Sequence, residues 1–372
     1  MRIGFLVSSY YPQVGGIQTH VRRIAEGCVA AGDEVTVLTH GESGQKPTEM
    51  IGGVRVLRFP LTVPSQAYPF SLKLFRYLRR HAKEFDLVHA HSYHTLAGQS
   101  AVGAGLPFVF TPHYHGTGHT PLSVLFHRVY RPVGARLFAA PQAIICVSKA
   151  ERELVVRNFP GAAGKVVTIP NGTDLRRTVP ASNAVPDNSR IVVTVGRLEP
   201  YKNVDLIIRA FRALPSAATL VIVGAGPDRN RLEQIARSCE PSWPIRFTGQ
   251  IPDDELDALL AQAGVVVSAS DHEAFGLVLA DGLLAGARVV ASDIPAHREV
   301  GELAGAHAPV TFIDPRQTRQ FAAALEAALT GGRLPAGSIR LPSWTDVTGL
   351  TRQVYAQVSA TSDLAVKIAR NA

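Results

Sequence analysis

The fold is decided at the start of the chain, where residues 1–40 read MRIGFLVSSYYPQVGGIQTHVRRIAEGCVAAGDEVTVLTH. Two runs rich in β-branched residues, Ile3–Ser8 and Glu34–Thr39, flank a segment with helical periodicity, Ile17–Ala31. Runs of this kind are typical of buried parallel strands, and parallel neighbours need a crossover between them that is usually a helix. The stretch therefore predicts an α/β fold with a doubly wound parallel sheet.

The same alternation continues along the chain and pauses once. The pause, residues 176–190, is rich in Pro, Ser and Asn and has the composition of a linker. We therefore expect two Rossmann-like domains that face each other across a cleft, with ligands at the carboxyl ends of their strands. The expected domains are residues 1–178 and 185–350, and a helix at about 353–372 packs back on the first. The further predicted strands are Leu87–Ala90, Phe108–Thr111, Ala143–Val147, Val166–Ile169, Ile191–Val195, Thr219–Val223, Ile245–Thr248, Val265–Ser268 and Arg288–Ser292.

Length and composition agree with this organisation. The chain has 372 residues, of which 46% are hydrophobic and 18% are charged. Such a chain can build two cores, and it is neither disordered nor a coiled coil. The richest apolar run of the chain, Leu137–Val147, is too short to span a bilayer. The first residues of the sequence lack the long apolar run of a signal peptide. The cysteines, Cys28, Cys146 and Cys239, lie far apart, so we expect buried thiols in a reducing cytoplasm.

The charge is unevenly distributed. Residues 1–180 carry 20 Lys and Arg against 10 Asp and Glu, whereas residues 181–372 carry 18 against 20. The first half also holds 10 of the 13 histidines. A basic half indicates an anionic partner, such as a phosphate or an acidic headgroup. Nucleic acid is not expected, because no nucleic-acid-binding motif accompanies the charge.

Two loops after predicted strands carry residues suited to a diphosphate. Gly15 and Gly16 open a helix whose free N–H groups can face an anion, although a plain tight turn explains them equally well. The second loop, Gly196–Asn203, places Arg197 and Lys202 five residues apart just before a helix. A guanidinium fork and an ammonium point charge suit a diphosphate there. The alternative is a pair of solvated surface charges.

A third loop, Ser268–Leu277, carries Glu273 and leads into a helix that contains Asp281. The two carboxylates are eight residues apart, slightly over two helical turns, so they lie on roughly the same side. They could accept hydrogen bonds from sugar and ribose hydroxyls, and the N–H groups near Phe275–Leu277 could meet phosphate. Alternatively, Glu273 is an ordinary dipole partner at a helix N-terminus.

Histidines cluster at two strand ends of the basic half. The pairs are His89 with His91 and His113 with His115, and His94 and His119 lie nearby. They have the look of metal ligands, but no carboxylate or cysteine accompanies them at metal-site spacing. We favour histidines that line a cleft and meet acceptor hydroxyls or phosphate.

With these segments in order along nearly the whole chain, the sequence resembles the retaining glycosyltransferases of family 4, which have the two-Rossmann GT-B fold. Trp344 and Tyr355 also fit the closing helices of that family. The matching segments are Gly15-Gly16, Val88–His91, Thr111–His113, Val147–Lys149, Ile169–Asp174, Gly196–Leu198 with Lys202-Asn203, Phe247–Gly249, Glu273–Leu277, and Ser292-Asp293 before Arg298–Val300.

The resemblance implies a hexosyltransferase of carbohydrate biosynthesis that uses a nucleotide-diphosphate sugar and no metal or other cofactor. Arg197 and Lys202 would hold the diphosphate and stabilise it as it leaves. Glu273 would bind sugar hydroxyls, and His113 would face the transferred sugar. No carboxylate is placed as an obvious nucleophile, so we expect same-face attack in which the leaving phosphate takes the acceptor's proton.

Further donor and acceptor residues follow from the same resemblance. Family members commonly bind ribose with a second glutamate, and here that position is Asp281, shorter by one methylene. UDP is the expected nucleotide and GDP the second choice. The other donor-binding residues implied are Gly15, Gly16, Gly196, Gln250, Ile251, Phe275, Gly276 and Leu277. The acceptor residues we expect are His91, His115 and Asn171.

The acceptor itself is left open. A glycan, a glycolipid and a small polyol or natural product all fit a basic N-terminal domain. Two basic segments, Ser71–His81 and Ser123–Arg131, could rest on an anionic membrane at its cytoplasmic face, or could be core-packed helices with a solvated basic face. Two other functions share such a fold: a sugar-nucleotide epimerase, and a non-catalytic nucleotide-sugar binding protein.

Overall fold

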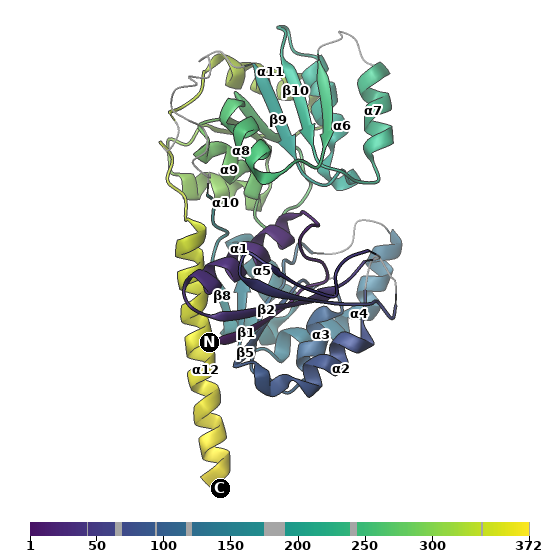
Figure 1. The fold of residues 1–372 in the computed structure, drawn as a ribbon. Coiled ribbons are helices and arrows are strands. Elements are labelled where there is room, and N and C mark those ends of the chain that lie inside the picture. Colours follow the sequence, from purple (N-terminus) through teal and green to yellow (C-terminus); the bar gives the residue numbers. More distant parts are fainter. Residues whose placement is uncertain are drawn as a thin grey trace. The chain divides into compact units, whose positions relative to one another are not determined.

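In the computed structural model the chain forms two compact units (Figure 1). Unit 1 is Met1–Asn171 with Trp344–Ala372, and unit 2 is Gly172–Ser343. The structure describes residues 1–42, 44–63, 69–93, 95–116, 121–174, 190–238, 244–335 and 338–371, with no side chains described for 121–129 and 361–371. Most of the predicted linker, and Cys239, His94 and His119, therefore lie outside the described residues.

Unit 1 is built on an eight-stranded sheet with the order β3-β4-β2-β1-β5-β6-β7-β8. Only the β3–β4 pair is antiparallel; the other neighbours are parallel. From the central strand β1 the chain first builds outward on one side and then restarts with β5 on the other. The direction of winding thus reverses between β1 and β5, which is where doubly wound sheets bind ligands. The strands are β1 (Arg2–Leu6), β2 (Glu34–His40), β3 (Thr48–Ile51), β4 (Val54–Phe59), β5 (Leu87–His91), β6 (Phe108–Thr111), β7 (Ala143–Cys146) and β8 (Val166–Thr168).

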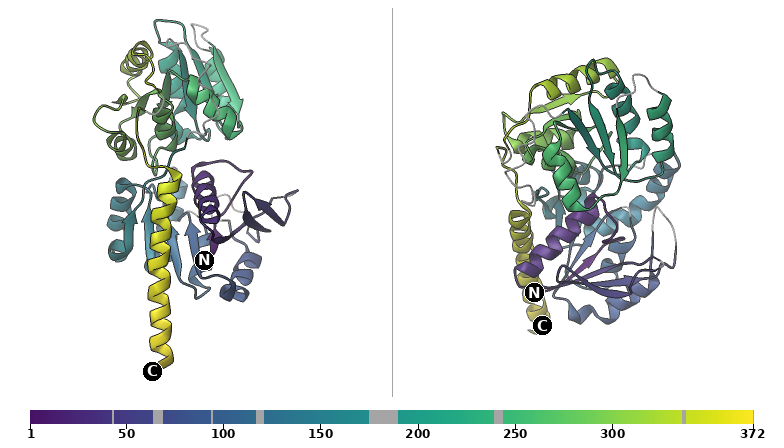
Figure 2. Two further views of the ribbon diagram at one scale, coloured as in Figure 1. Left: turned by 60° about the vertical axis from the view of Figure 1, so that its left-hand side comes forward. Right: turned by 45° about the horizontal axis from the view of Figure 1, so that its top comes forward.

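Helix α12 (Trp344–Asn371) brings the end of the chain back to unit 1 (Figure 2). It packs along α1 and β6, with Tyr355 fully buried, and Arg352 pairs with Asp33 at 2.7 Å. The helix begins at Trp344, about nine residues before the expected start, so the predicted boundary at 350 lies inside it. The other unit 1 helices are α1 (Gly16–Ala30), α2 (Leu72–Arg80), α3 (Ala97–Val102), α4 (Pro121–Ala139), α5 (Lys149–Asn158) and two short 3₁₀ turns, Ala82–Glu84 and Pro160–Lys165.

Unit 2 is built on a six-stranded, fully parallel sheet with the order β11-β10-β9-β12-β13-β14. Here the winding reverses between β9 and β12. The strands are β9 (Ile191–Val195), β10 (Thr219–Val223), β11 (Ile245–Gly249), β12 (Val265–Ser268), β13 (Arg288–Ser292) and β14 (Val310–Ile313). The helices are α6 (Val204–Arg212), α7 (Arg229–Ser238), α8 (Asp253–Gln262), α9 (Leu277–Leu284), α10 (Pro295–Ala304) and α11 (Thr318–Thr330), with the 3₁₀ turn Pro200–Lys202.

The predicted α/β fold with two Rossmann-like domains is confirmed, and each predicted strand is present within a residue or two. Three strands escaped prediction: β3 and β14 have four residues each and lie at the edges of their sheets, and β4 is a six-residue strand beside β3. Cys28 and Cys146 are buried free thiols, as expected. Among the described residues, no helix is long and apolar enough to cross a membrane.

Candidate functional site

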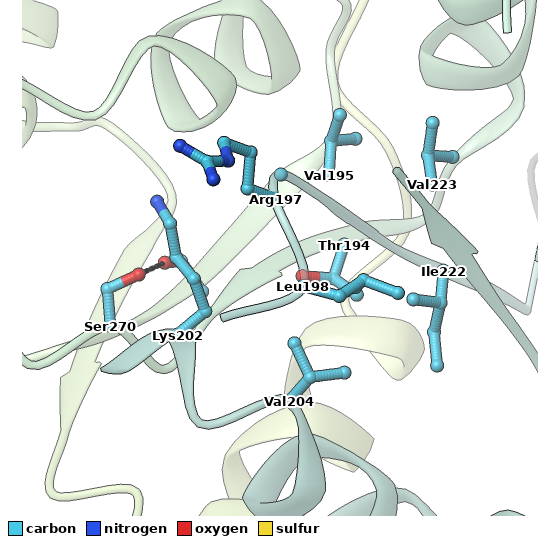
Figure 3. Close-up of a pocket in the computed structure, with 11 residues that line it drawn as sticks. Thr194, Val195, Arg197, Leu198, Lys202, Val204, Ile222, Val223 and Ser270 are labelled. Atoms are coloured by element: carbon cyan, nitrogen blue, oxygen red, sulfur yellow. Dashed lines mark hydrogen bonds between the residues drawn. The ribbon is translucent and has the colours of Figure 1, made fainter. Parts of the chain in front are cut away.

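A pocket in unit 2 lies at the point where the sheet reverses its winding (Figure 3). It is lined by the loop after β9, the end of β10 and the loop after β12. The lining residues are Thr194, Val195, Gly196, Arg197, Leu198, Lys202, Val204, Ile222, Val223, Ser268 and Ser270. The predicted diphosphate loop therefore forms one wall of this pocket.

The loop after β9 is held by the glycine-rich turn after β10. Gly196 N donates to the carbonyl of Val223 at 3.0 Å, and Leu198 N donates to that of Ala225 at 3.0 Å. Gly224 has φ +129°, and a Cβ there would lie 1.9 Å from the Gly196 carbonyl oxygen. Glycine is thus required at Gly224 for the two loops to pack together.

Arg197 and Lys202 point their cationic ends to the same side of the pocket (Figure 3). Arg197 is 65% exposed and donates from Nη2 to Glu199 Oε1 at 2.6 Å. Lys202 is only 18% exposed and donates from Nζ to Glu273 Oε1 at 2.5 Å. The pocket thus holds two cations, one largely exposed and one largely buried, and each has a carboxylate partner.

The Lys202–Glu273 pair keeps both groups charged. Burial alone would raise the pKa of Glu273, but the Lys202 ammonium and a 2.8 Å hydrogen bond from Ser270 Oγ hold it below its usual 4.5. Burial likewise opposes the charge on Lys202, and Glu273 raises the pKa of Lys202 above its usual 10.5 in spite of it. Because both groups stay charged, Lys202 can bind an anion and Glu273 can accept hydrogen bonds from hydroxyl groups without a proton transfer between them.

A buried hydrogen-bond chain behind Glu273 fixes its loop. Ser292 Oγ donates to the Ser270 carbonyl at 2.6 Å, and His297 Nδ1 lies 2.9 Å from the Ser292 carbonyl oxygen. On the other side, the rings of Tyr201 and His272 stack with centroids 4.4 Å apart. Glu273 therefore sits on a rigid support, although its own side chain reaches solvent.

Six further predicted donor residues lie in unit 2, and none of them is among the residues that line this pocket. Phe275 is buried, and Gly276 caps α9 with φ +112°, a conformation that favours glycine. Leu277 is the first residue of α9, and Asp281 is half-buried in its second turn. Gln250 and Ile251 follow β11, the edge strand, on the far side of β10 from β9.

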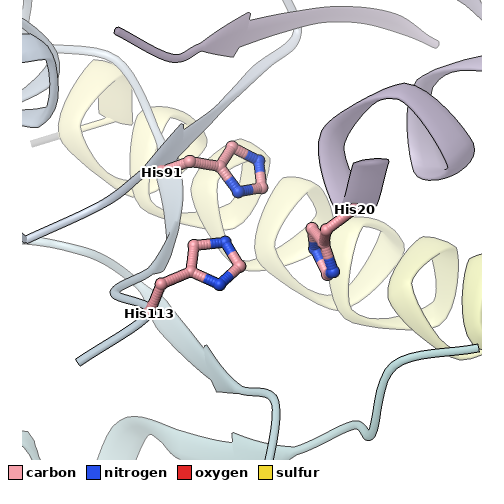
Figure 4. Close-up of side chains that lie close together, drawn as sticks. All are labelled: His20, His91 and His113. Atoms are coloured by element: carbon pink, nitrogen blue, oxygen red, sulfur yellow. The ribbon is translucent and has the colours of Figure 1, made fainter. Parts of the chain in front are cut away.

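Three histidines meet in unit 1, at its own reversal point (Figure 4). His91 ends β5, His113 follows β6, and His20 reaches them from α1. All three are at most 5% exposed, and their ligand nitrogens lie within 4.8 Å of one another. Asn171, after β8, accepts a hydrogen bond from His20 Nδ1 at 2.7 Å. Gly15 and Gly16 form the start of α1, one turn before His20.

Burial keeps these imidazoles neutral. It lowers the pKa of His20 to about 4, against the opposing effect of Asn171. It also lowers the pKa values of His91 and His113 well below 6.5, and the neighbouring histidines act in the same direction. His113 adopts φ +47°, which is unusual for a residue with a Cβ and aims its ring at the cluster.

The predicted histidine pairs are divided by the structure. His89 is a core residue, with Nδ1 2.6 Å from the Tyr355 hydroxyl and Nε2 2.8 Å from Thr111 Oγ1, so the expectation that it lines a cleft is wrong. His115 is half-buried beside the cluster and outside it. One member of each pair therefore joins His20 instead.

Three residues of these two sites were not predicted from the sequence: His20, Glu199 and Ser270. A signal for His20 was present, because it precedes the buried positions Val21 and Ile24 on the inner face of α1. Glu199 and Ser270 carried no signal, since both act through contacts that only the folded loops create.

Comparison with known proteins assigns the chain to a family. Residues 14–177 match the profile of Glycosyltransferase Family 4, and residues 176–337 match that of Glycosyl transferases group 1. The phosphatidyl-myo-inositol mannosyltransferase of Mycolicibacterium smegmatis is 30% identical, covering 96% of this chain and 94% of that protein. The chain belongs to glycosyltransferase family 4. It is a transferase, as the sequence predicted.

Solved structures share the fold of this glycosyltransferase. Sucrose-phosphate synthase from Thermosynechococcus elongatus superposes with a TM-score of 0.72 at 20% identity, covering 97% of this chain and 99% of that one. HepE from Anabaena, solved in complex with UDP and glucose, gives 0.71 at 19% identity, covering 99% of both chains. These likenesses confirm the GT-B fold.

Proposed function

We propose that this glycosyltransferase moves a hexose or hexosamine from a nucleotide-diphosphate sugar to an acceptor hydroxyl, with retained configuration and without a metal ion. The observation that carries the proposal is the arrangement of Arg197, Lys202 and Glu273 at the reversal point of the unit 2 sheet. UDP is the favoured nucleotide, supported by the complex of HepE with UDP and glucose, and GDP is the second choice.

When the donor diphosphate binds, Arg197 exchanges its carboxylate partner, Glu199, for a phosphate. Arg197 is mostly exposed and paired with Glu199 within its own loop, so its guanidinium can turn from Glu199 to a phosphate at small cost. Lys202 stays on Glu273 and offers its remaining N–H bonds to the other phosphate. With two cations at the diphosphate, no metal is needed to neutralise the charge that develops on the leaving group.

The chemical step breaks the bond between the anomeric carbon and the β-phosphate oxygen and forms a bond to the acceptor oxygen. The acceptor's proton passes to the leaving phosphate on the same face, so the configuration is retained. Arg197 and Lys202 stabilise the transition state, in which negative charge grows on the diphosphate. Glu273 orients the sugar through its hydroxyls, and His113 is proposed to face the sugar from unit 1.

We assign the acceptor to the class of hydroxyls carried by an anionic lipid or phosphorylated polyol. The mannosyltransferase relative is named for phosphatidyl-myo-inositol, and unit 1 contains the basic half of the chain. On α2, Leu74 and Leu78 are buried while Lys73, Arg76, Arg79 and Arg80 face solvent. Because its apolar face is used in the core, α2 would meet an anionic membrane by charge alone, at about 1 kcal/mol per basic residue. The second basic segment, Ser123–Arg131, has no described side chains up to residue 129.

The first experiment measures thermal unfolding with UDP, GDP, dTDP, ADP or NAD, each with EDTA. We expect one nucleoside diphosphate, UDP, to raise Tm by a few degrees at saturation, unaffected by EDTA. Stabilisation by GDP alone would show that the base of the donor is guanine and not uracil. If no nucleoside diphosphate raises Tm, the proposed donor site is overturned.

The second experiment distinguishes the three function classes with the nucleotide sugar that binds best. A transferase releases UDP only with an acceptor, tested with phosphatidylinositol vesicles, inositol 1-phosphate and an oligosaccharide. An epimerase would convert the sugar with no acceptor, and a binding protein would do neither. The anomeric configuration of the product, read by NMR, tests retention.

Membrane contact is tested by co-sedimentation with vesicles of phosphatidylglycerol and phosphatidylcholine at low salt. Replacing Arg76, Arg79 and Arg80 by Gln should reduce the bound fraction several-fold, since it removes three exposed charges from α2. The control replaces three exposed basic residues of unit 2, Arg237, Arg298 and Arg316, by Gln. Equal losses for both variants would place the contact elsewhere.

A further inference from the structure

The histidine cluster of unit 1 has open nitrogen atoms, and of its three residues only His113 has a place in the proposed donor chemistry. Neither ring nitrogen of His91 has a hydrogen-bond partner, and neither has Nε2 of His113, although all three atoms are buried. A buried polar atom without a partner costs about 1–3 kcal/mol. The cluster is thus arranged to receive something that supplies those partners.

Asn171 sets the ligand atom of His20. Its Oδ1 is an acceptor, so His20 Nδ1 must carry the proton and Nε2 keeps its lone pair. Histidines that bind metals almost always donate their other N–H to such an acceptor, which fixes the ring and its tautomer. His20 therefore already has the support that a metal ligand needs.

The geometry points to a site for one Zn²⁺-like transition-metal ion held by His20, His91 and His113 (Figure 4); this is our own proposal. Three imidazoles with an open fourth position match the ligand set of zinc sites that bind an exchangeable molecule. The rings come from α1, β5 and the loop after β6, so they approach one point from different directions.

Small adjustments complete the coordination. Nitrogen atoms around a tetrahedral Zn²⁺, with bonds of about 2.0–2.1 Å, lie roughly 3.4 Å apart. The three ligand nitrogens already lie within 4.8 Å of one another, so side-chain rotations bring them into range. Imidazole ligands without carboxylates select Zn²⁺, Cu²⁺, Ni²⁺ or Co²⁺ over Mg²⁺ and Ca²⁺.

The ion would act on the enzyme as an inhibitor. This consequence rests on the proposed function, in which His113 faces the transferred sugar. A metal on His113 occupies that position, and with three neutral ligands it keeps its double positive charge and draws an anion to its open site. Activity measured with EDTA should therefore exceed activity with Zn²⁺, and equal activities would show that the bound ion does not inhibit.

The test uses untagged full-length protein stripped with EDTA and then freed of the chelator. Zn²⁺ is titrated in competition with a chromophoric chelator, and Co²⁺ binding is followed by visible absorption. We expect one tightly bound ion per chain. His91→Gln should weaken binding more than 100-fold by removing a ligand, and Asn171→Ala about 10- to 100-fold by releasing His20.

His307→Gln is the matched control, because it removes an exposed histidine of unit 2 and should leave binding unchanged. Folding is checked by the Tm of each variant with EDTA, and Zn²⁺ should raise Tm for the parent but not for His91→Gln. Failure of the parent to bind one ion, or undiminished binding by a folded His91→Gln, would overturn the site.

Failures of the site and of the proposed function are separable. Binding and Tm need no turnover, so a chain that binds Zn²⁺ but never transfers sugar would refute only the function. A chain that transfers sugar with EDTA and binds no Zn²⁺ would refute only the metal site.

Discussion

The two sheets reverse their winding in the same way, yet they bring opposite kinds of groups to the reversal point. In unit 2 the groups are ionised and paired: Arg197 with Glu199, and Lys202 with Glu273. In unit 1 they are neutral imidazoles with open nitrogens, buried among aromatic rings. The common backbone geometry supplies a place for a ligand, and the loops and helix starts supply its chemistry.

This difference predicts two modes of binding. A ligand in unit 2 must replace an existing partner, so its affinity depends on how weakly that partner is held. A ligand in unit 1 adds partners to atoms that have none, so it relieves a cost already present in the fold. Substitutions that change one partner at a time test this contrast.

The largest effect is expected for Lys202→Met. It removes a preorganised donor from the leaving diphosphate and leaves Glu273 without its counterion. We expect kcat to fall about 100- to 1,000-fold. The control is Arg237→Met, which removes an exposed charge from α7 and should leave the rate unchanged. The kcat values of both variants are measured by steady-state kinetics, with the donor that the thermal unfolding experiment identifies. A near-parental kcat for Lys202→Met would refute the role of Lys202 in stabilising the leaving diphosphate.

The next largest effect is on stability as a function of pH, through Glu273. Because its folded pKa is held below 4.5, the folded state releases its proton more readily than the unfolded state. The ion pair therefore stabilises the chain fully above about pH 4.5, and this stability is lost as the pH falls further. We expect Glu273→Gln to lower the free energy of unfolding by about 1–2 kcal/mol at pH 7.

The measurement is urea unfolding of parent and Glu273→Gln at several pH values between neutral and acidic. The gap between the two should shrink as the pH falls below about 4.5, since Glu273 then binds a proton in the unfolded parent more readily than in the folded parent. A gap that stays constant with pH would show that Glu273 stabilises the loop by packing and neutral hydrogen bonds alone.

The sequence predicted the fold because local pattern and topology agree in this chain. Buried parallel strands appear as continuous apolar runs, and most of them are followed by a helix. Of the strands that escaped, β3 and β14 have four residues each and no buried position, whereas four of the six positions of β4 are buried. The return of α12 at Trp344 depends on a packing surface of unit 1 that no local pattern reveals.

The two sites were predictable to different degrees. The loop with Arg197 and Lys202 follows β9, and the loop with Glu273 follows β12, the next strand in the sheet. Their convergence could therefore be inferred from the order of elements. The pairing of Arg197 with Glu199 could not, because it depends on loop conformation. The histidine cluster was predicted with wrong partners, since His89 turns to Tyr355 and His20 takes its place.

Glu199→Gln should have a smaller effect, and in the direction of tighter binding. The substitution removes the carboxylate that Arg197 must leave to reach a phosphate. Because Arg197 is 65% exposed, the ion pair is weak, and we expect affinity for UDP to rise about 2- to 5-fold at low salt and less at high salt. Calorimetry at two salt concentrations measures this, with Glu255→Gln, an exposed carboxylate of α8, as the control. Weaker binding by Glu199→Gln would mean that Glu199 orients Arg197 instead of competing for it.

An equally small effect is expected at Asp281, where the resemblance predicts a ribose contact made by a longer side chain. Asp281→Glu adds one methylene on the second turn of α9, so a carboxylate that falls short of the ribose would then reach it. We expect affinity for UDP to rise about 2- to 5-fold, which corresponds to about 0.5–1 kcal/mol, the lower part of the range for one hydrogen bond. Affinity for 2′,3′-dideoxy-UDP should not change, since it lacks the hydroxyls that the carboxylate would bind.

Asp254→Glu on α8 makes the same change at an exposed position and serves as the control. Equal gains for both nucleotides would point to the helix or its charge as the cause, and no gain for either would remove Asp281 from the donor site.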